Sequence, residues 1–324
     1  MPLLAECAIT PDVFDMNSYS TPDECAARIE NIRETILTGG LVRDLCDGSW
    51  SALFNTGQRQ VRRHAAAEAP TPWTDSGKRT WHRRGTELVK KLTMQKRLVP
   101  YRPANPGPPA DDVGWCTEAL ATHATQPLTG GVIVTKPLKD QYASERVVAR
   151  IDRLSSAQWW RDMQSASIRL TRTCADYEWH LDPVLRCSNS LMFIDPYVDP
   201  TEPGYQCLGT LLQRVGRRTP APLIEIHRRV PTDRDMEEFK CQFRDALFEP
   251  LRAAGLNARV FMWTRFHDRY LISNLVGISL PYGFDTGRGR TTWTRLGMDD
   301  RDDIQREFDP NSLQRKLVSD FTIP

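Results

Sequence analysis

Short apolar runs alternate with amphipathic helical segments between residues 130 and 283, and this alternation restricts the folds that the chain can adopt. The runs "GGVIVT" (130–135), "SLMFIDPYV" (190–198) and "APLIEIHRRV" (221–230) have the length and the branched side chains typical of buried strands. By contrast, "DRDMEEFKCQFRDALFEPLRAAG" (233–255) repeats its apolar residues at helical spacing and ends at a glycine. Because strands that alternate with helices build α/β sheets, we expect a mixed or largely parallel sheet flanked by helices.

The other segments between residues 130 and 283 also alternate between predicted strands and predicted helices. For example, "SIRLTRT" alternates apolar and polar residues, as a half-buried strand does. Asp195-Pro196-Tyr197 is expected to end a strand with a buried tyrosine rather than to supply a catalytic acid. We further expect helices over 139–154, 175–189 and 205–218, and strands over 167–173, 258–265, 268–273 and 276–283.

Helical signals dominate the first hundred residues. "TPDECAARIENIRETILTGG" offers Thr21 as an N-cap, Pro22 at the first helical position and a Gly-Gly stop, which together predict a helix. Further helices are expected over 41–54 and 86–95. "PANPGPPADD" (103–112) is rich in prolines, which cannot enter a helix or a central strand. We therefore expect a mainly helical, basic region over 1–112 and an α/β domain over 113–324.

The net charge of +2 conceals a strong asymmetry. Residues 1–50 carry three Lys or Arg against nine Asp or Glu, a net −6, whereas residues 51–104 carry twelve against three, a net +9. Because clustered cations neutralise phosphates and aromatic faces stack on bases, the second block, with Trp73, Trp81 and Tyr101, is typical of a nucleic-acid-binding segment. Pairing with the acidic first fifty residues is the alternative. The candidate nucleic-acid-binding residues are Lys78, Arg79, Arg83, Arg84, Lys90, Lys91, Lys96 and Arg97.

Composition argues against several classes of protein. No apolar run approaches the roughly 18–20 residues of a membrane-spanning helix, and the amino terminus lacks the basic region of a signal peptide. The eight cysteines and six histidines show no CxxC, HExxH or paired metal-ligand spacing. We therefore expect a cytoplasmic protein with mostly reduced cysteines, no membrane span, no metal site and no cofactor.

The strongest chemical signal lies in "RVFMWTRFHDRYLISNLVGISLPYGFD". Here His267-x-Arg269 is followed after four residues by Asn274, and then by Gly277-x-Ser279. This pattern resembles the phospholipase D superfamily signature, which reads H-x-K, four residues, D, and then a G-S or G-T step. It is also similar to the phospholipase D-like carboxy-terminal domain of MIT-domain proteins, whose motif begins H-D-R and continues to a glycine-rich G-x-D segment.

The resemblance covers roughly residues 165 to 285, because "LMFIDPYVD" also resembles the I-x-D-P-Y strand that precedes the motif in such domains. It implies a phospholipase D-like mixed sheet and a histidine nucleophile that cleaves phosphodiesters without metal. The superfamily uses two motifs per active centre, so one motif here implies a homodimer that brings two copies of His267 together. The resemblance also suggests a bacterial defence or mobile-element setting.

The alternation of side chains along a strand predicts that the charged residues of the motif lie on one face. If the strand continues, residues i and i+2 face the same side, so Arg265, His267 and Arg269 form one row of phosphate-binding groups. Arg269 replaces a lysine and Asn274 an acid, and both departures weaken the case for catalysis. The candidate catalytic residues are His267, Arg269 and Asn274, and the candidate phosphate-binding residues are Arg265, Ser279, Arg288, Arg290 and His227.

The sequence thus favours a protein that binds nucleic-acid backbone, DNA or RNA, through a degenerate phospholipase D-like domain and a basic amino-terminal region. One alternative is a metal-independent dimeric nuclease that uses His267. Another is a phosphoinositide-binding or protein-interaction module, as the MIT-associated domains are understood to be. Further protein subunits remain open as partners.

Overall fold

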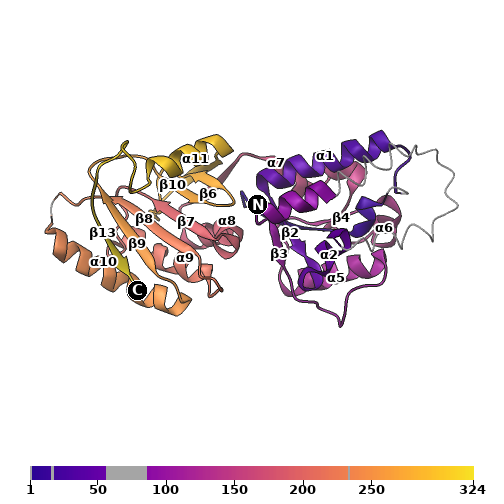
Figure 1. The fold of residues 1–324 in the computed structure, drawn as a ribbon, viewed down its shortest axis with the longest axis horizontal. Coiled ribbons are helices and arrows are strands. Elements are labelled where there is room, and N and C mark those ends of the chain that lie inside the picture. Colours follow the sequence, from indigo (N-terminus) through magenta and orange to yellow (C-terminus); the bar gives the residue numbers. More distant parts are fainter. Residues whose placement is uncertain (1, 16–17, 56–85, 233) are drawn as a thin grey trace. The chain divides into compact units, whose positions relative to one another are not determined.

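The computed structural model describes residues 2–15, 18–55, 86–232 and 234–324, which form two compact units (Figure 1). Unit 1 comprises Leu3–Gln164 and unit 2 comprises Ser165–Pro324. Each unit contains its own β-sheet with flanking helices. The expected α/β class is therefore confirmed, and it extends to the amino-terminal half as well.

Unit 1 is built on a parallel five-stranded sheet in the order β3-β2-β1-β4-β5. Figure 1 shows α1 and α7 on one face of this sheet and α2 and α5 on the other. The strands are β1 (Ala5–Ile9), β2 (Gly40–Asp44), β3 (Leu98–Pro100), β4 (Val132–Val134) and β5 (Val148–Arg150). The helices are α1 (Pro22–Gly39), α2 (Leu45–Asn55), α5 (Asp112–Thr125), α6 (Lys136–Gln141) and α7 (Gln158–Gln164), and residues 86–94 are also helical.

The expected domain boundary between residues 112 and 113 is wrong. The proline-rich segment joins β3 to α5 within unit 1, and its backbone is tied to that helix. Buried Glu118 accepts hydrogen bonds from the backbone N–H groups of Ala104 (2.6 Å) and Asn105 (3.2 Å). Because its polar groups are satisfied inside the unit, the segment is a crossover connection of the sheet and not a linker.

The expectation of a mainly helical amino-terminal region is also wrong, because buried charges conceal two strands. Glu6 of β1 and Arg43 of β2 are both buried, and their side chains lie 3.6 Å apart. Arg43 donates to the carbonyl of Gln126 (2.6 Å), and the Tyr101 hydroxyl donates to Glu6 (2.7 Å). Polar residues at these positions break the apolar runs that predict strands, so residues 41–54 were expected to be one helix. Residues 139–154 likewise hold α6 and β5 in place of a continuous helix.

The first helix forms as predicted. The Thr21 side chain accepts a hydrogen bond from the N–H of Glu24 (3.1 Å), and the Glu24 carboxylate accepts one from the N–H of Ser20 (3.2 Å). This reciprocal capping box satisfies backbone donors that the first helical turn leaves free. The helix ends at Gly39, where β2 begins.

Unit 2 contains a mixed eight-stranded sheet in the order β13-β9-β8-β7-β10-β11-β12-β6. β7, β8 and β9 are parallel to one another, and the other pairings are antiparallel. The strands are β6 (Ser167–Thr171), β7 (Ser190–Ile194), β8 (Leu223–Arg229), β9 (Ala258–Trp263), β10 (Tyr270–Ser273), β11 (Gly277–Ser279), β12 (Arg290–Arg295) and β13 (Leu317–Ile323). The helices are α8 (Cys174–Cys187), α9 (Cys207–Val215), α10 (Met236–Ala254) and α11 (Met298–Glu307).

The predicted strands and helices between residues 167 and 283 are present, with shorter bounds. In α10, the Asp235 side chain accepts hydrogen bonds from the N–H groups of Glu237 (2.9 Å) and Glu238 (3.0 Å). Gly255 ends this helix in the left-handed region, at φ +66°. Figure 1 places α11 on one face of the sheet and α9 and α10 on the other.

Six of the eight cysteines are reduced thiols, as expected for mostly reduced cysteines, and the other two are paired. Cys174 and Cys207 form a disulfide that joins the first residues of α8 and α9. No described helix combines the length and the apolar character that crossing a membrane requires.

Candidate functional site

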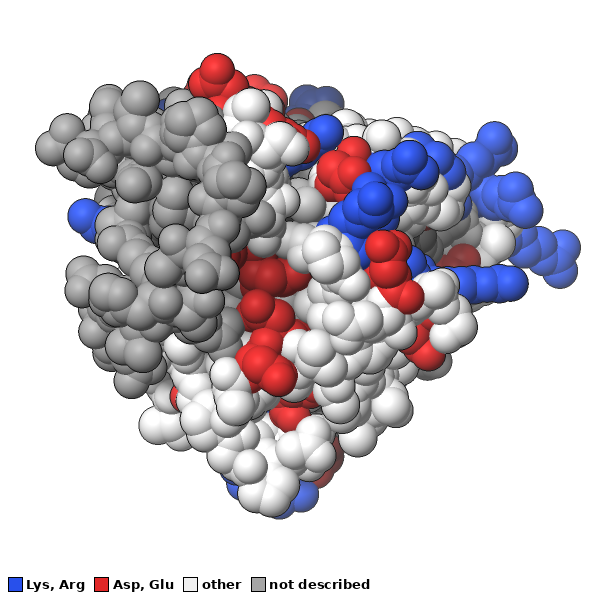
Figure 2. Space-filling view, turned by 90° about the vertical axis from the view of Figure 1, so that its right-hand side faces the viewer, with Lys and Arg blue, Asp and Glu red and all other residues white. Residues whose placement is uncertain are grey.

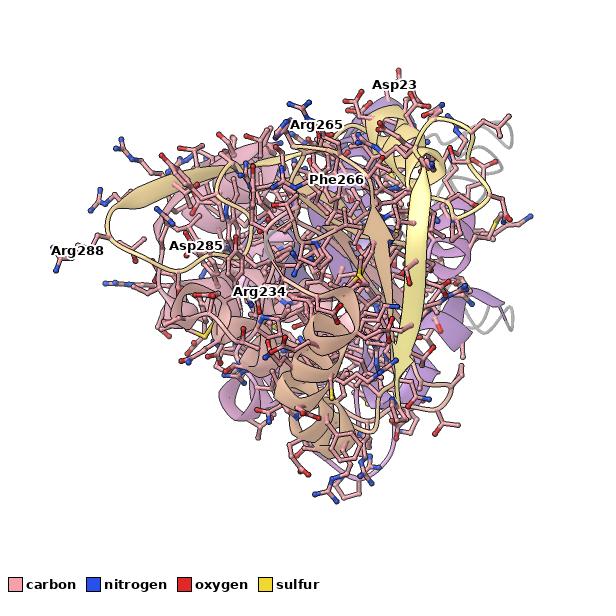
Figure 3. The ribbon with its side chains drawn as sticks, turned by 90° about the vertical axis from the view of Figure 1, so that its left-hand side faces the viewer. Asp23, Arg234, Arg265, Phe266, Asp285 and Arg288 are labelled. Carbon is pink, nitrogen blue, oxygen red and sulfur yellow. A yellow bond between two sulfur atoms is a disulfide. The ribbon has the colours of Figure 1, made fainter. Side chains whose placement is uncertain are left out.

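Five segments of unit 2 meet at one edge of its sheet. β7, β8 and β9 run parallel and end at this edge. β10 begins there and β11 ends there, since Tyr270 lies opposite both Ile194 and Ser279. Figure 3 shows Arg234, Arg265 and Asp285, which follow three different strands, at the end of the unit that faces the reader. We call this end the carboxyl edge of unit 2, and ligands of α/β sheets commonly bind at such edges.

A buried carboxylate organises the carboxyl edge. Asp195 follows β7 directly, is fully buried, and accepts hydrogen bonds from the backbone N–H groups of Tyr197 (2.9 Å) and Phe284 (3.1 Å). The Tyr205 hydroxyl also donates to it, and Arg269 Nε lies 3.8 Å from Oδ1. Burial raises the pKa of Asp195, and these donors and the guanidinium act in the opposite direction. The carboxylate therefore anchors turns that are 89 residues apart in the chain.

Gly283 makes this anchoring possible. It has φ +60°, and a Cβ at this position would lie 1.8 Å from Oδ2 of Asp195. Any other residue would displace the carboxylate or the turn, so glycine is required here for both space and backbone conformation.

Two arginines flank an exposed tyrosine beside the anchor. The guanidinium of Arg229, the last residue of β8, lies 5.1 Å from the centre of the Tyr197 ring, and that of Arg269 lies 5.2 Å from it. Arg269 also donates to the carbonyl of Pro281 (3.2 Å). The Arg269 side chain is 27% exposed and the Tyr197 residue 40% exposed, so both are accessible to a ligand. Tyr197 was expected to be buried, and that prediction is wrong.

A second tyrosine lies near the turn after β11. Tyr282 is 51% exposed, and the guanidinium of Arg172 lies 4.3 Å from its ring centre. Arg172 also forms an ion pair with Asp285, whose backbone carbonyl accepts a hydrogen bond from the Tyr177 hydroxyl (2.9 Å). This turn is thus held by contacts of its own as well as by Asp195.

The predicted row of Arg265, His267 and Arg269 forms only in part. Residues 264–269 are a loop and not a strand. Arg265 and His267 are exposed, and Phe266 between them is buried and packs against Phe308 with ring centres 5.1 Å apart. Arg269 instead turns toward Asp195. Within the described part of the chain, the His267 side chain has no hydrogen-bond or ion-pair partner that would orient it.

His227 is not a phosphate ligand, which corrects the prediction. It is fully buried, and its Nδ1 accepts a hydrogen bond from Trp263 Nε1 (3.2 Å). The ring stacks on Phe261 at 4.9 Å and meets Phe308 edge-on at 5.5 Å. Burial lowers the pKa of His227, although Glu225 at 3.6 Å from Nε2 acts against this shift. The side chain is therefore a neutral member of the core.

Asn274 does not lie with His267 either, so its expected catalytic role is wrong. It follows β10 at the opposite end of the strand from Arg269. Its side-chain oxygen accepts a hydrogen bond from the N–H of Asn189 (2.7 Å) and secures the turn before β7. Ser279 ends β11 opposite Tyr270 at the carboxyl edge, and its phosphate-binding role stays a prediction.

Arg288 and Arg290 are exposed, as a phosphate-binding role requires. They lie on the loop between β11 and β12 and at the first residue of β12. Arg288 projects outward in Figure 3. Neither side chain has an ion-pair partner in the ranges that the structure covers.

Of the basic block (residues 51–104), the structure describes only residues 51–55 and the part from residue 86 onward. Lys78, Arg79, Arg83 and Arg84 lie outside the described residues. Lys90, Lys91 and Lys96 are exposed, and a nucleic-acid contact by them stays a prediction. Arg97 is buried and donates to the carbonyl of Gly40 (2.8 Å), so it supports the sheet of unit 1 and is not available to a ligand.

The carboxyl edge of the unit 1 sheet has a different character. Asp12, which follows β1, is buried, and its carboxylate accepts hydrogen bonds from the hydroxyls of Thr10 and Thr135. Asp44, the last residue of β2, accepts hydrogen bonds from the N–H (2.9 Å) and hydroxyl (2.7 Å) of Ser51. In Figure 2, acidic side chains run through the middle of the end of unit 1 that faces the reader.

Sequence reasoning missed Arg172, Tyr205 and Tyr282 at the carboxyl edge of unit 2. The signal that could have pointed to Tyr282 is the repeated Pro-Tyr step, Pro196-Tyr197 and Pro281-Tyr282. In the described ranges, no three or more His, Cys, Asp or Glu side chains are grouped so that they could hold a metal ion. No family model matches the sequence, and no curated protein matches it.

Proposed function

We propose that unit 2 binds the phosphodiester backbone of nucleic acid at its carboxyl edge. The observation that carries the proposal is the pair of guanidinium groups of Arg229 and Arg269, which lie 5.1 Å and 5.2 Å from the centre of the exposed Tyr197 ring. The buried Asp195 accepts a hydrogen bond from the backbone N–H of Tyr197 and lies 3.8 Å from Arg269. Guanidinium groups form charge-assisted, bidentate hydrogen bonds with phosphate oxygens. A fixed pair of them beside an accessible aromatic ring suits a chain of phosphates and bases.

The surrounding charges support the same ligand. Arg265, Arg288 and Arg290 are exposed and have no acidic partner among the described residues. Arg234 differs, because it forms ion pairs with Asp199 (3.1 Å) and Glu202 (3.0 Å). Arginines without acidic partners release counterions when they bind phosphates, which gives affinity for backbone irrespective of sequence. The resemblance to the phospholipase D signature favours the same class of ligand, since that superfamily acts on phosphodiesters.

Binding of a labelled oligonucleotide, followed by fluorescence anisotropy, tests the proposal. We expect the dissociation constant of the wild type to rise by orders of magnitude between about 50 and 200 mM salt. The Arg229→Gln and Arg265→Gln variants are each expected to bind roughly fivefold to tenfold more weakly and to reduce the salt slope by about one. Arg217→Gln is the matched control, because Arg217 is exposed and precedes β8 at the opposite edge of the sheet.

Two results would contradict the proposal. One is an equal loss of affinity in Arg217→Gln and Arg229→Gln, which would assign binding to general surface charge. The other is tight binding to vesicles that contain phosphoinositide together with weak binding to DNA and RNA. That outcome would make unit 2 a lipid-headgroup module.

A second candidate function is metal-independent phosphodiester cleavage, which the accessibility of His267 favours. An exposed imidazole two residues from Arg265 can attack phosphorus and form an N–P bond while the P–O bond to the leaving alkoxide breaks and the guanidinium holds the non-bridging oxygens. The alkoxide takes a proton from a second imidazole, and water then hydrolyses the phosphohistidine. Such a centre would need a second His267 from another copy of the chain. Cleavage by the wild type that is lost in His267→Ala, with binding retained, would support it, and the absence of cleavage by wild-type dimers would remove it.

A further inference from the structure

We infer that Tyr197 and Tyr282 stack on unpaired bases, so that the ligand of the carboxyl edge is single-stranded nucleic acid. This inference rests on the proposed function and adds the class of nucleic acid to it. It comes from the arrangement of both tyrosine rings, whereas the proposed function depends on the arginines and their binding of phosphate.

The two rings are presented by similar local structures. Each tyrosine follows a proline, whose fixed φ limits the conformations of the turn. The carbonyl of Pro196 accepts a hydrogen bond from the backbone N–H of Arg229 (3.3 Å), and that of Pro281 accepts one from the Arg269 guanidinium (3.2 Å). Both Pro-Tyr steps are therefore held by the arginines that the proposed function places on phosphate.

One carboxylate orders both steps. Oδ1 of Asp195 accepts a hydrogen bond from the N–H of Tyr197, and Oδ2 accepts one from the N–H of Phe284, two residues after Tyr282. The tyrosines are 85 positions apart in sequence, yet each is within two residues of a bond to Asp195. Rings that are ordered before binding lose little conformational entropy when a ligand stacks on them.

Exposure and cations indicate what the rings bind. Tyr197 and Tyr282 are 40% and 51% exposed, and arginines lie over both rings. A strand that passes over such alternating rings and cations can place bases on the rings and phosphates on the guanidinium groups. In a duplex, the base faces are stacked on one another and cannot reach the rings, so the arrangement favours unpaired strands.

The test compares three ligands of equal length: single-stranded oligothymidine, an abasic sugar-phosphate strand, and a duplex. We expect Tyr197→Leu and Tyr282→Leu each to weaken oligothymidine binding about tenfold and to leave abasic-strand binding unchanged. Tyr→Phe at either position keeps the ring and should retain most of the affinity. Phe248→Leu is the matched control, because Phe248 is 39% exposed and lies about 18 Å along α10 from Met236.

Several outcomes overturn the inference and leave the proposed function standing. These are equal binding of the abasic strand and oligothymidine by the wild type, a preference for the duplex, or losses no larger than that of Phe248→Leu. Dissociation of a dimer in Tyr197→Leu with unchanged binding would also overturn it, since the ring would then serve a contact between copies. Failure of the proposed function is different: no strand, with or without bases, would then bind in a salt-dependent way.

Discussion

The two units each bury a carboxylate beside an arginine, and the two pairs differ in how completely they are enclosed. In unit 1, Glu6 and Arg43 are both buried, Arg43 also donates to the carbonyl of Gln126, and Glu6 also accepts from the Tyr101 hydroxyl. In unit 2, Asp195 is buried, but the side chain of Arg269 is 27% exposed. The first pair is a closed structural contact, whereas the second leaves a cation available to a ligand.

The difference follows from where each pair lies on its sheet. Glu6 and Arg43 lie within adjacent strands, where helices cover both faces. Asp195 and Arg269 lie just outside the ends of β7 and β10, where turns and the short helical turn with Tyr205 cover the carboxylate while the arginine side chain reaches the surface. A buried ion pair is weak support for stability but costly to break on one side, so the two pairs should respond differently to substitution.

The largest expected effect is in unit 1. Arg43→Met should cost about 3–5 kcal/mol, because the buried charge of Glu6 would lose its cationic neighbour. Urea unfolding followed by tryptophan fluorescence measures this loss. Glu6→Gln combined with Arg43→Met should recover part of it, since no buried charge remains. A loss below about 1 kcal/mol would indicate that the pair behaves like a solvent-exposed one.

Gly283→Ala should be the most damaging single change at the carboxyl edge of unit 2. The new Cβ would overlap Oδ2 of Asp195, and alanine at φ +60° is strained. We expect a loss of about 2–3 kcal/mol in unit 2 and weaker oligonucleotide binding, because the Asp195 anchor is displaced. Gly107→Ala is a control, since it also has a positive φ but nothing lies within 4 Å of its Cβ position. Equal losses in both variants would show that backbone strain alone accounts for the effect.

Arg269→Gln should separate stability from binding. Asp195 would keep two backbone donors and the Tyr205 hydroxyl, so we expect a stability loss of about 1 kcal/mol or less. Oligonucleotide affinity should fall about tenfold, and Arg269→Lys should restore only part of it, because an ammonium group lacks the planar fork. A stability loss as large as that of Arg43→Met would contradict the distinction between an open and a closed pair.

The smallest expected effect is the pH dependence that the buried His227 gives to the stability of unit 2. Burial lowers the pKa of His227 below its ordinary value of 6.5. Below that value the unfolded chain binds more protons than the folded chain, so the stability of unit 2 should fall as the pH drops from about 6.5 toward the folded pKa. His227→Phe removes this group and should flatten that dependence in unfolding experiments between about pH 7.5 and 5. An unchanged pH profile would assign the acid sensitivity to other groups.

Local sequence signals were sufficient for much of unit 2 and for the ends of several helices. Thr21 and Asp235 cap their helices by accepting hydrogen bonds from backbone N–H groups up to three residues later, so their effect can be predicted from the sequence. The strand β7 is buried after its first residue and reads as a continuous apolar run. In unit 1 the sequence predicted β4 but not β1 and β2, because the charged residues Glu6 and Arg43 interrupt their apolar runs.

The sequence also singled out the loop with Arg265 and His267, because its spacing resembles a known signature. It did not indicate that Asn274 lies at the opposite end of β10 from that loop, or that His227 belongs to the core. Those outcomes depend on strand order and register, which bring distant segments together and are not encoded at any single position.

The residues around Asp195 show the same division between local and long-range information. The chain alone specifies a strand that ends at Asp195, a Pro-Tyr step after it, and a second Pro-Tyr step before Gly283. That both steps share one buried carboxylate, with Arg269 beside it and Arg229 near Tyr197, follows from parallel β7 and β8 ending at the edge where antiparallel β10 begins. The physical reason is that a hydrogen bond between residues 89 positions apart forms only when the sheet has brought them together.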